Sequence, residues 1–199
     1  AEFSLDADES FKTFPSPIVF DMYRYGTHCD ARATVDGWCE ADFDDSKWKN
    51  ALLADAPKGD IIKCTAHPVT SRGEIAPVSI EKQENFSYYK DQIENGKDTP
   101  ETMVDSGYLY DFGINTSGVC RLKIKGKRGD RIVTSCAEVL DKDGNFYNDN
   151  YRSAKNRCEY ILSGGDDVFK PSFTFQGYRY IRLDEFPFDE VDLSCFTSV

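Results

Sequence analysis

Short segments in which apolar and polar residues alternate constrain the fold of this chain more than any other feature. Between residues 120 and 125, Cys, Leu and Ile alternate with Arg and two Lys, which is the pattern of a half-buried β-strand. The Gly-Lys-Arg-Gly stretch at 126–129 predicts a turn, and residues 131–138 predict a second strand. We therefore expect these two strands to form a hairpin.

The strand pattern recurs through the C-terminal part of the chain. Segments 158–162, 178–184 and 191–197 alternate in the same way, and the Asp143-Gly144 pair is a strong turn signal. Many short strands, regular turns and no long helical period predict an all-β fold, an antiparallel β-sandwich. Alternation within 178–184 predicts two faces, with Arg179, Ile181 and Leu183 on one and Tyr178, Tyr180 and Arg182 on the other.

Two further segments interrupt the series of strands. Residues 88–103 are polar and contain Gly96 and Pro100, so we expect a surface insertion with one helical turn. The Pro57-Lys58-Gly59 stretch separates a Trp-containing segment from the long strand series. The sequence thus predicts two domains, 1–58 and 59–199.

The charge balance restricts the partners of the protein. Asp and Glu outnumber Lys and Arg by 35 to 24, which gives a formal net charge of −11. Such a surface repels phosphate backbones and anionic membranes, whereas a neutral carbohydrate is indifferent to it. No apolar run approaches the roughly 18 residues of a membrane helix. We therefore expect neither a nucleic acid nor a membrane as partner.

Seven cysteines and two histidines limit the chemistry of metals and disulfides. No Cys-x-x-Cys spacing occurs, which argues against a zinc site. We expect most thiols to be free in the core, and hence a reducing, cytoplasmic environment. One or two disulfides in a secreted protein are the alternative. The cysteines are Cys29, Cys39, Cys64, Cys120, Cys136, Cys158 and Cys195.

A stretch in the first quarter of the chain resembles bacterial α-L-rhamnosidases. Residues 25–32, Tyr-Gly-Thr-His-Cys-Asp-Ala-Arg, are similar to the family's Gly-Glu-Thr-Tyr-Asp-Ala-Arg. Gly37-Trp38 and the Phe-Asp-Asp-Ser-Lys-Trp of 43–48 follow in family order. His28 and Cys29 depart from the family pattern. The resemblance implies that residues 1–58 are the end of the family's N-terminal jelly-roll domain.

A longer set of motifs resembles the concanavalin-like domain of the same family. The resemblance covers residues 59–199 and implies a concanavalin-like sandwich. In the family a catalytic (α/α)6 barrel with the two catalytic acids follows this domain, so we expect no catalytic residue here. The motifs begin at Asp111-Phe112-Gly113-Ile114-Asn115 and Gly118, continue at Ala137–Leu140, Asp143-Gly144, Tyr147, Asn150, Arg152–Ala154, Tyr160, Leu162, Gly164 and Pro171, and end at Phe173–Tyr180.

Catalytic motifs of other enzyme classes are incomplete in this chain. Glu190 and Asp192 begin the Glu-x-Asp-x-x-Glu strand of concanavalin-like glucanases, but Cys195 replaces the second Glu. His28 and Cys29 are neighbours, and adjacent strand residues point to opposite faces, which argues against Cys-His catalysis. These departures favour a non-catalytic chain.

Polar and aromatic residues near the second set of motifs are the candidates for carbohydrate binding. Aromatic faces, carboxylates, amides and guanidinium groups are the usual partners of sugars. The alternative is a structural ion pair between Glu138 and Arg152 beside a tyrosine network. The candidates are Glu138, Asn150, Arg152, Gln176 and Tyr178.

An acidic turn is the candidate for calcium binding. Asp141, Asp143, Asn145 and Asp149 supply hard oxygen ligands, although Gly144 comes too early for an EF-hand. A plain hairpin turn is the alternative. We also expect Trp38 and Trp48 to be buried, with sugar stacking as the alternative.

Three functions remain open at the level of sequence. The resemblance implies an accessory domain that packs on the catalytic barrel of an enzyme hydrolysing terminal α-L-rhamnose with inversion. An autonomous module for L-rhamnose-containing glycans would bind sugar and lose affinity on replacing Arg152 or Tyr178. A complete small glycosidase would turn over an aryl rhamnoside and depend on Glu138.

Overall fold

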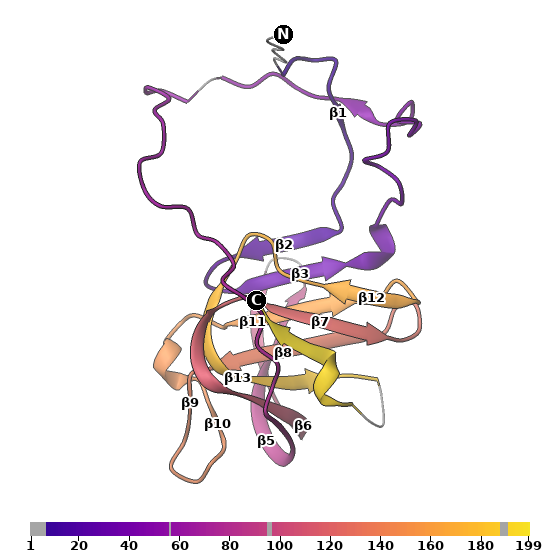
Figure 1. The fold of residues 1–199 in the computed structure, drawn as a ribbon. Helices are drawn as coiled ribbons and strands as arrows, with labels where there is room; N and C mark the ends of the chain where they lie inside the picture. The colour runs from indigo at the N-terminus through magenta and orange to yellow at the C-terminus, as the bar shows by residue number, and fades with distance from the viewer. Residues whose placement is uncertain (1–6, 56, 95–96, 188–190) are drawn as a thin grey trace. The chain divides into compact units, whose positions relative to one another are not determined.

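The computed structural model describes residues 7–55, 57–94, 97–187 and 191–199, with side chains described outside 85–105. Its internal contacts divide the chain into two compact units (Figure 1). One comprises Ala1–Ser16 and Ala33–Thr70, and the other Pro17–Arg32 and Ser71–Val199. This division differs from the predicted boundary at residue 58, because residues 17–32 supply two strands to the second unit.

The first unit contains one short ladder and an aromatic cluster. Strand β1 (Lys12–Thr13) pairs antiparallel with β4 (Lys49–Asn50). The Trp48 ring stacks on Phe14 at a centroid distance of 5.2 Å and meets Phe43 edge-on at 5.4 Å. Trp48 is half-buried, but Trp38 is 62% exposed, so the expectation that Trp38 is buried is wrong.

The second unit is a β-sandwich whose larger layer has seven strands, in the order β2-β3-β11-β8-β13-β6-β5. All neighbouring strands are antiparallel except β3 and β11, which run parallel. The strands are β2 (Ile18–Met22), β3 (Gly26–Asp30), β5 (Ser79–Glu94), β6 (Lys97–Gly118), β8 (Arg131–Ala137), β11 (Arg157–Ile161) and β13 (Gln176–Glu185).

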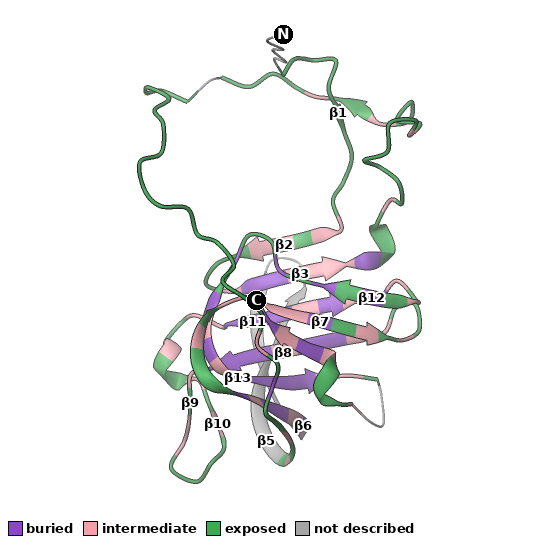
Figure 2. Ribbon diagram, in the orientation of Figure 1, coloured by how far each residue is buried: buried purple, intermediate pink, exposed green. Residues whose placement is uncertain are grey.

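The smaller layer has three strands, in the order β12-β7-β14. These are β12 (Asp166–Phe169), β7 (Cys120–Lys125) and β14 (Phe196–Ser198). Buried residues concentrate in β8, β11 and β13 at the middle of the larger sheet (Figure 2). The main core contains Tyr110, Phe112, Ile132, Tyr160, Tyr178, Ile181 and Leu183 from the larger sheet and Leu122, Phe169 and Phe196 from the smaller.

Short elements complete the second unit. A hairpin of β9 (Val139–Leu140) and β10 (Phe146–Tyr147) lies against the other face of the larger sheet, where Leu140 and Phe146 pack on Leu109, Ala137 and Tyr180. The described helices are the 3-10 turns η1 (Ala31–Ala33), η2 (Asp149–Tyr151) and η3 (Leu193–Cys195). None of them is long and apolar enough to span a membrane. The all-β prediction is confirmed.

The predicted hairpin between 120–125 and 131–138 is wrong in its pairing. Both segments are strands, but β7 belongs to the three-stranded sheet and β8 to the seven-stranded sheet. The turn between them crosses from one layer to the other. It is fixed by Lys127 N donating to Asp130 Oδ2 at 2.7 Å and by Gly129 N donating to the carbonyl of Leu162 at 3.0 Å.

The predicted helical turn within 88–103 is also wrong. Strands β5 and β6 pair from Ser79 opposite Asp111 to Glu94 opposite Lys97, so the segment is part of a long hairpin. The Asn95-Gly96 pair, a hairpin signal, stands between the two strands and lies outside the described residues. The segment forms strands although its composition is polar, because the backbone groups of β5 and β6 pair with each other.

A register shift in β13 corrects the predicted faces of 178–184. Tyr178 of β13 pairs with Thr116 of β6, but Tyr180 pairs with Asp111, so residues 112–115 of β6 lie opposite Arg179 and interrupt the regular pairing. Tyr178 therefore joins Ile181 in the main core. Tyr180 packs on the opposite face of the sheet. The simple period of two fails because this irregularity shifts the alternation of side chains between Tyr178 and Ile181.

All seven cysteines are free thiols in the structure. Cys136 and Cys158 are buried, Cys39 and Cys64 are exposed, and the remaining three are half-buried. Burial raises the pKa of Cys158 to about 11, so this thiol is protonated at neutral pH.

Candidate functional site

The face of the larger sheet that points away from the main core carries a network of charged residues. Arg131 on β8 bonds Glu159 of β11 with Nη2 and Oε2 2.6 Å apart, and its other terminal nitrogen bonds Glu185 of β13. Burial raises the pKa of the Glu159 carboxyl, but the Arg131 guanidinium outweighs this effect and the pKa falls below its usual range. The network thus joins three neighbouring strands.

A second buried pair continues this network along β13. Arg182 Nε and Asp184 Oδ1 are 2.5 Å apart, and Ser135 Oγ donates to Asp184 Oδ2 at 2.5 Å. The Arg182 guanidinium also lies 4.1 Å from the centroid of the Phe146 ring. A cation over an aromatic face is a favourable contact. This network was not predicted from the sequence. Its signal was the presence of charged residues at alternate positions of strands that are otherwise apolar.

Glu138 lies between β8 and β9 and contacts the start of β13. Asn115 Nδ2 donates to Glu138 Oε1 at 3.2 Å. A Cβ on Gly177 would lie 3.1 Å from the same oxygen, so only glycine fits there without displacing the carboxylate. The hydroxyl of Tyr151 donates to the Gly177 carbonyl at 2.9 Å. Glu138, Asn115 and Tyr151 therefore gather around Gly177.

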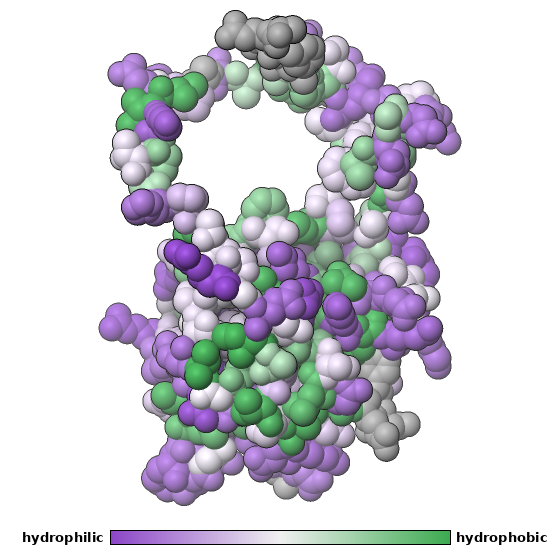
Figure 3. All heavy atoms as spheres, in the orientation of Figure 1, coloured by the Kyte–Doolittle hydropathy of each residue, from purple (hydrophilic) through white to green (hydrophobic). Residues whose placement is uncertain are grey.

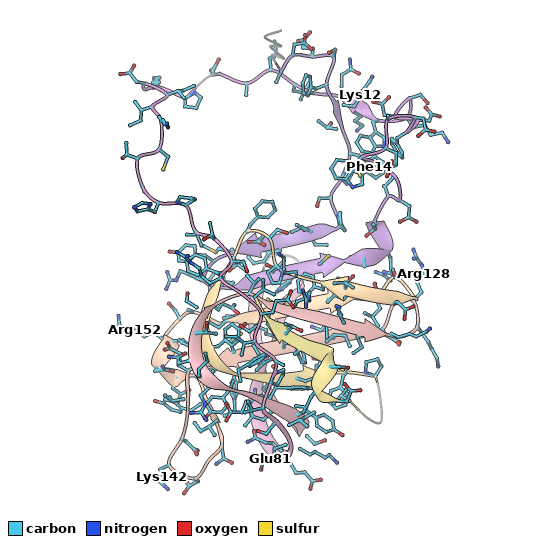
Figure 4. The ribbon with its side chains drawn as sticks, viewed as in Figure 1. Lys12, Phe14, Glu81, Arg128, Lys142 and Arg152 are labelled. Atoms are coloured by element: carbon cyan, nitrogen blue, oxygen red, sulfur yellow. The ribbon has the colours of Figure 1, made fainter. Side chains whose placement is uncertain are left out.

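Asn150 and Arg152 lie at η2 and are exposed. Arg152 has φ +58° and ψ −114°, a backbone conformation that is strained for a residue with a side chain. Its side chain projects away from the sheets (Figure 4). Among the described residues no ion pair joins Arg152 to Glu138, so the alternative of a structural Glu138–Arg152 pair is wrong.

Gln176 and Tyr178 point into the sandwich instead. The Cys136 thiol donates to Gln176 Oε1 at 2.7 Å, and the Tyr178 hydroxyl donates to Ser198 Oγ at 2.7 Å. Burial raises the pKa of Tyr178 above its usual range. Because Gly177 lies between them and faces Glu138, these two side chains lie on the opposite side of the sheet from Glu138. The structure does not bring the five candidates for carbohydrate binding together.

The acidic turn is a hairpin loop. Asp141 Oδ1 accepts from the backbone N–H groups of Asp143 at 2.9 Å and Asn145 at 2.8 Å, and Asn145 Nδ2 donates to Asp141 Oδ2 at 3.1 Å. These bonds hold the pKa of Asp141 below its usual range. Asp143 pairs with Lys142, and Asp149 lies in η2. Within the described part of the chain, no three His, Cys, Asp or Glu residues gather where they would hold a metal ion.

Comparison with known families identifies both parts of the chain. A sequence model of the bacterial α-L-rhamnosidase concanavalin-like domain matches residues 101–199. A model of the α-L-rhamnosidase N-terminal domain matches residues 2–72. The second match includes β2 and β3, which the structure assigns to the sandwich.

Relatives and solved structures agree with these matches. An α-L-rhamnosidase from Alteromonas sp. is 31% identical over 90% of this chain and 18% of its own length. The structure of the α-L-rhamnosidase from Dictyoglumus thermophilum matches with a TM-score of 0.78 and 30% identity, covering 96% of this chain and 20% of that protein. The Streptomyces avermitilis α-L-rhamnosidase, solved with L-rhamnose, matches with a TM-score of 0.79 and 28% identity, covering 96% and 17%.

The chain thus spans about a fifth of the length of the proteins it matches, and it does so over nearly its whole own length. Both matched models describe domains of α-L-rhamnosidases, and together they cover most of the chain. The chain therefore belongs to the α-L-rhamnosidase family, of which it comprises the N-terminal and concanavalin-like domains.

Proposed function

We propose that this chain is a non-catalytic accessory part of an α-L-rhamnosidase, which supports a catalytic barrel and shapes the approach of rhamnosylated substrates to it. The observation that carries the proposal is the extent of the matches. At least 90% of the chain matches the Alteromonas and Streptomyces enzymes, but it covers only 18% and 17% of their lengths. Those proteins therefore contain much more than this fold.

The ionisation of the carboxyl groups supports a non-catalytic role. An inverting glycosidase needs a general acid whose pKa is raised, facing a second carboxylate. Every described carboxyl group whose pKa departs from its ordinary value is shifted downward. In the larger sheet, hydrogen bonds from Arg131 and Arg179 lower the pKa of Glu159 and Asp111. Such carboxylates stabilise strands but do not donate protons near neutral pH.

The surface of the sandwich supports packing against a larger body. Apolar side chains lie among polar ones on the face that carries β14 and η3 (Figure 3). Val78 is 66% exposed, Ile114 54% and Leu193 39%. A single exposed apolar residue needs no explanation, whereas apolar residues that gather on one face suit a protein interface.

Complementation in trans tests the accessory role. An α-L-rhamnosidase is produced without the region that this chain matches, and its melting temperature and rate on an aryl α-L-rhamnoside are measured with and without the purified chain. The proposal predicts that the chain raises one or both. A chain carrying Val78→Asp, Ile114→Asp and Leu193→Asp should raise neither. If the truncated enzyme has full activity and stability alone, the accessory role is wrong.

An autonomous carbohydrate-binding module is the second candidate, and the strained backbone of Arg152 favours it. Backbone strain at an exposed arginine is a feature of ligand-binding positions. Calorimetric titration with L-rhamnose, first with calcium and then with a chelator, tests it. Binding that is lost in Arg152→Ala and kept in Lys142→Ala, at the tip of the β9–β10 hairpin, would establish a module. No heat at millimolar sugar would leave the accessory role as the better account.

A further inference from the structure

A small cavity lies inside the sandwich, between the two sheets. Its volume is about 20 Å³. The walls come from both layers, since Cys120 belongs to β7 and the residues Thr134, Cys136 and Cys158 belong to β8 and β11. Thr174, which precedes β13, and Gln176, the first residue of that strand, close one side.

Two polar atoms of this wall are buried without a hydrogen-bond partner among the described residues. They are Thr174 Oγ1 and Gln176 Nε2. Thr174 is 4% exposed and Gln176 is 9% exposed, so bulk water does not solvate them. The bond from the Cys136 thiol to Gln176 Oε1 fixes one end of the amide, and the NH2 group at its other end is left with two donors to satisfy. Leaving such groups unbonded costs free energy.

The cavity has the size and the polar groups that one water molecule requires. A buried water needs at least about 10–15 Å³ and two to four polar partners. The volume exceeds that limit, and the Thr174 hydroxyl and the Gln176 amide supply an acceptor and donors. A purely apolar void of this size would stay dry.

We propose that a single ordered water molecule binds in this cavity, accepting a hydrogen bond from Gln176 Nε2 and bonding Thr174 Oγ1. The water joins the segment before β13 to the first residue of that strand. It thereby closes the end of the sandwich next to the pairing of Gln176 with Gly118. This site is independent of the accessory role and of any sugar binding.

A metal ion is the competing occupant, since three thiols line the cavity. Burial raises the pKa of Cys120, Cys136 and Cys158 above the usual range, so a metal ion would have to displace their protons in order to bind. Metals bind the thiolate form. No three potential ligands gather among the described residues in a way that would hold a metal.

Nuclear magnetic resonance of the whole chain tests the water directly. The side-chain amide protons of Gln176 should show cross-relaxation with a water molecule of long residence, with the sign expected for a bound species. The signal should persist in Thr174→Ser, which keeps the hydroxyl, and weaken in Thr174→Val, which removes it. Cross-relaxation from Gln176 only to the Thr174 hydroxyl, in a direct bond between the two side chains, would overturn the proposal.

The sign of a melting-temperature change gives a second test. If the water bridges the two side chains, Thr174→Val removes one of its partners, and Tm should fall by about 2–6 °C. If the hydroxyl is unbonded in the folded protein, the same nearly isosteric change removes a buried polar group at no loss, and Tm should stay constant or rise. The second result would overturn the proposal.

Discussion

Gly26 in β3 shows how one residue sets the approach of two strands. Its φ is +86°, and a Cβ there would lie 1.7 Å from the carbonyl oxygen of Arg157 in β11. No side chain fits, because the obstacle is backbone and cannot rotate away. The Gly of the family-like Tyr-Gly-Thr-His stretch is therefore required by the close contact between β3 and β11, the parallel pair of the larger sheet.

We predict that Gly26→Ala lowers the free energy of unfolding by on the order of 3 kcal/mol or more, because backbone strain adds to a steric clash. Gly144→Ala is the matched control. Gly144 has φ +84°, but nothing lies within 4 Å of its would-be Cβ, so about 1–2 kcal/mol is expected from strain alone. Urea unfolding of both variants measures the difference. Equal losses would contradict the close approach of β3 to β11.

Asp184 is the residue on which the buried charges of β13 depend. Its side chain is 1% exposed and that of Arg182 is 5% exposed. Removing one partner of a buried pair leaves a charge in a poorly solvated position. We predict that Asp184→Asn lowers the free energy of unfolding by about 3–5 kcal/mol.

The exposed pair of Lys125 and Asp166 provides the control for this prediction. Its side chains are 78% and 84% exposed, and the two groups are 3.6 Å apart. Asp166→Asn should cost less than about 1 kcal/mol, because solvent screens such pairs. If chemical denaturation shows similar losses for the two variants, the charges on β13 do not act as a buried pair.

At the scale of elements, the Arg131 network makes the larger sheet sensitive to acid. The folded pKa of Glu159 lies below its unfolded value. Its carboxylate therefore contributes its full stability at pH values above the unfolded pKa of about 4.3. That contribution is lost as the pH falls through the folded pKa. Acid should weaken the connection between β8 and β11.

Glu159→Gln tests this dependence, because an amide does not titrate in this range. Unfolding free energies measured from about pH 6 down to about pH 3 should fall less steeply in Glu159→Gln than in the wild type. The variant should also be less stable at neutral pH, since Arg131 loses a charged partner. An unchanged slope would show that other carboxyl groups control the acid response.

The strands were predictable from the sequence, but their partners were not. Alternation located β7, β8, β11 and β13 to within a residue or two. It did not show that β7 and β8 lie in different sheets, because a strand's own pattern contains no information about its neighbour. The irregular pairing opposite Arg179 changed which side chains of β13 share a face, and the polar hairpin of β5 and β6 had no apolar period to reveal it.

The candidate site was predictable only as a set of residue types. Glu138 has Asn115 and Tyr151 as neighbours, and neither of them was among the predicted site residues. Gln176 and Tyr178 were assigned to the same surface, but they point into the sandwich, because neighbouring strand positions face opposite sides. The acidic residues near 141 form a turn whose N–H groups occupy the Asp141 carboxylate. Side-chain direction in the sheet decided the outcome for Gln176 and Tyr178, and backbone hydrogen bonds decided it for Asp141.

At the scale of the whole molecule, the chain is a sandwich with a packed core joined to a unit that has little core of its own. None of the described residues of the first unit is buried. The family match extends over both, and the solved relatives are five to six times longer. The proposed accessory role assigns the hydrolytic chemistry of these longer relatives to the parts that this chain does not match.

Hydrolysis of 4-nitrophenyl α-L-rhamnopyranoside by the purified chain is the most direct test of this account. The account predicts that nitrophenol is released no faster than in buffer, at every pH from about 4 to about 8, the range in which general acids of glycosidases act. Steady release that disappears in Glu138→Gln would contradict it, and would show that the sandwich is itself a glycosidase.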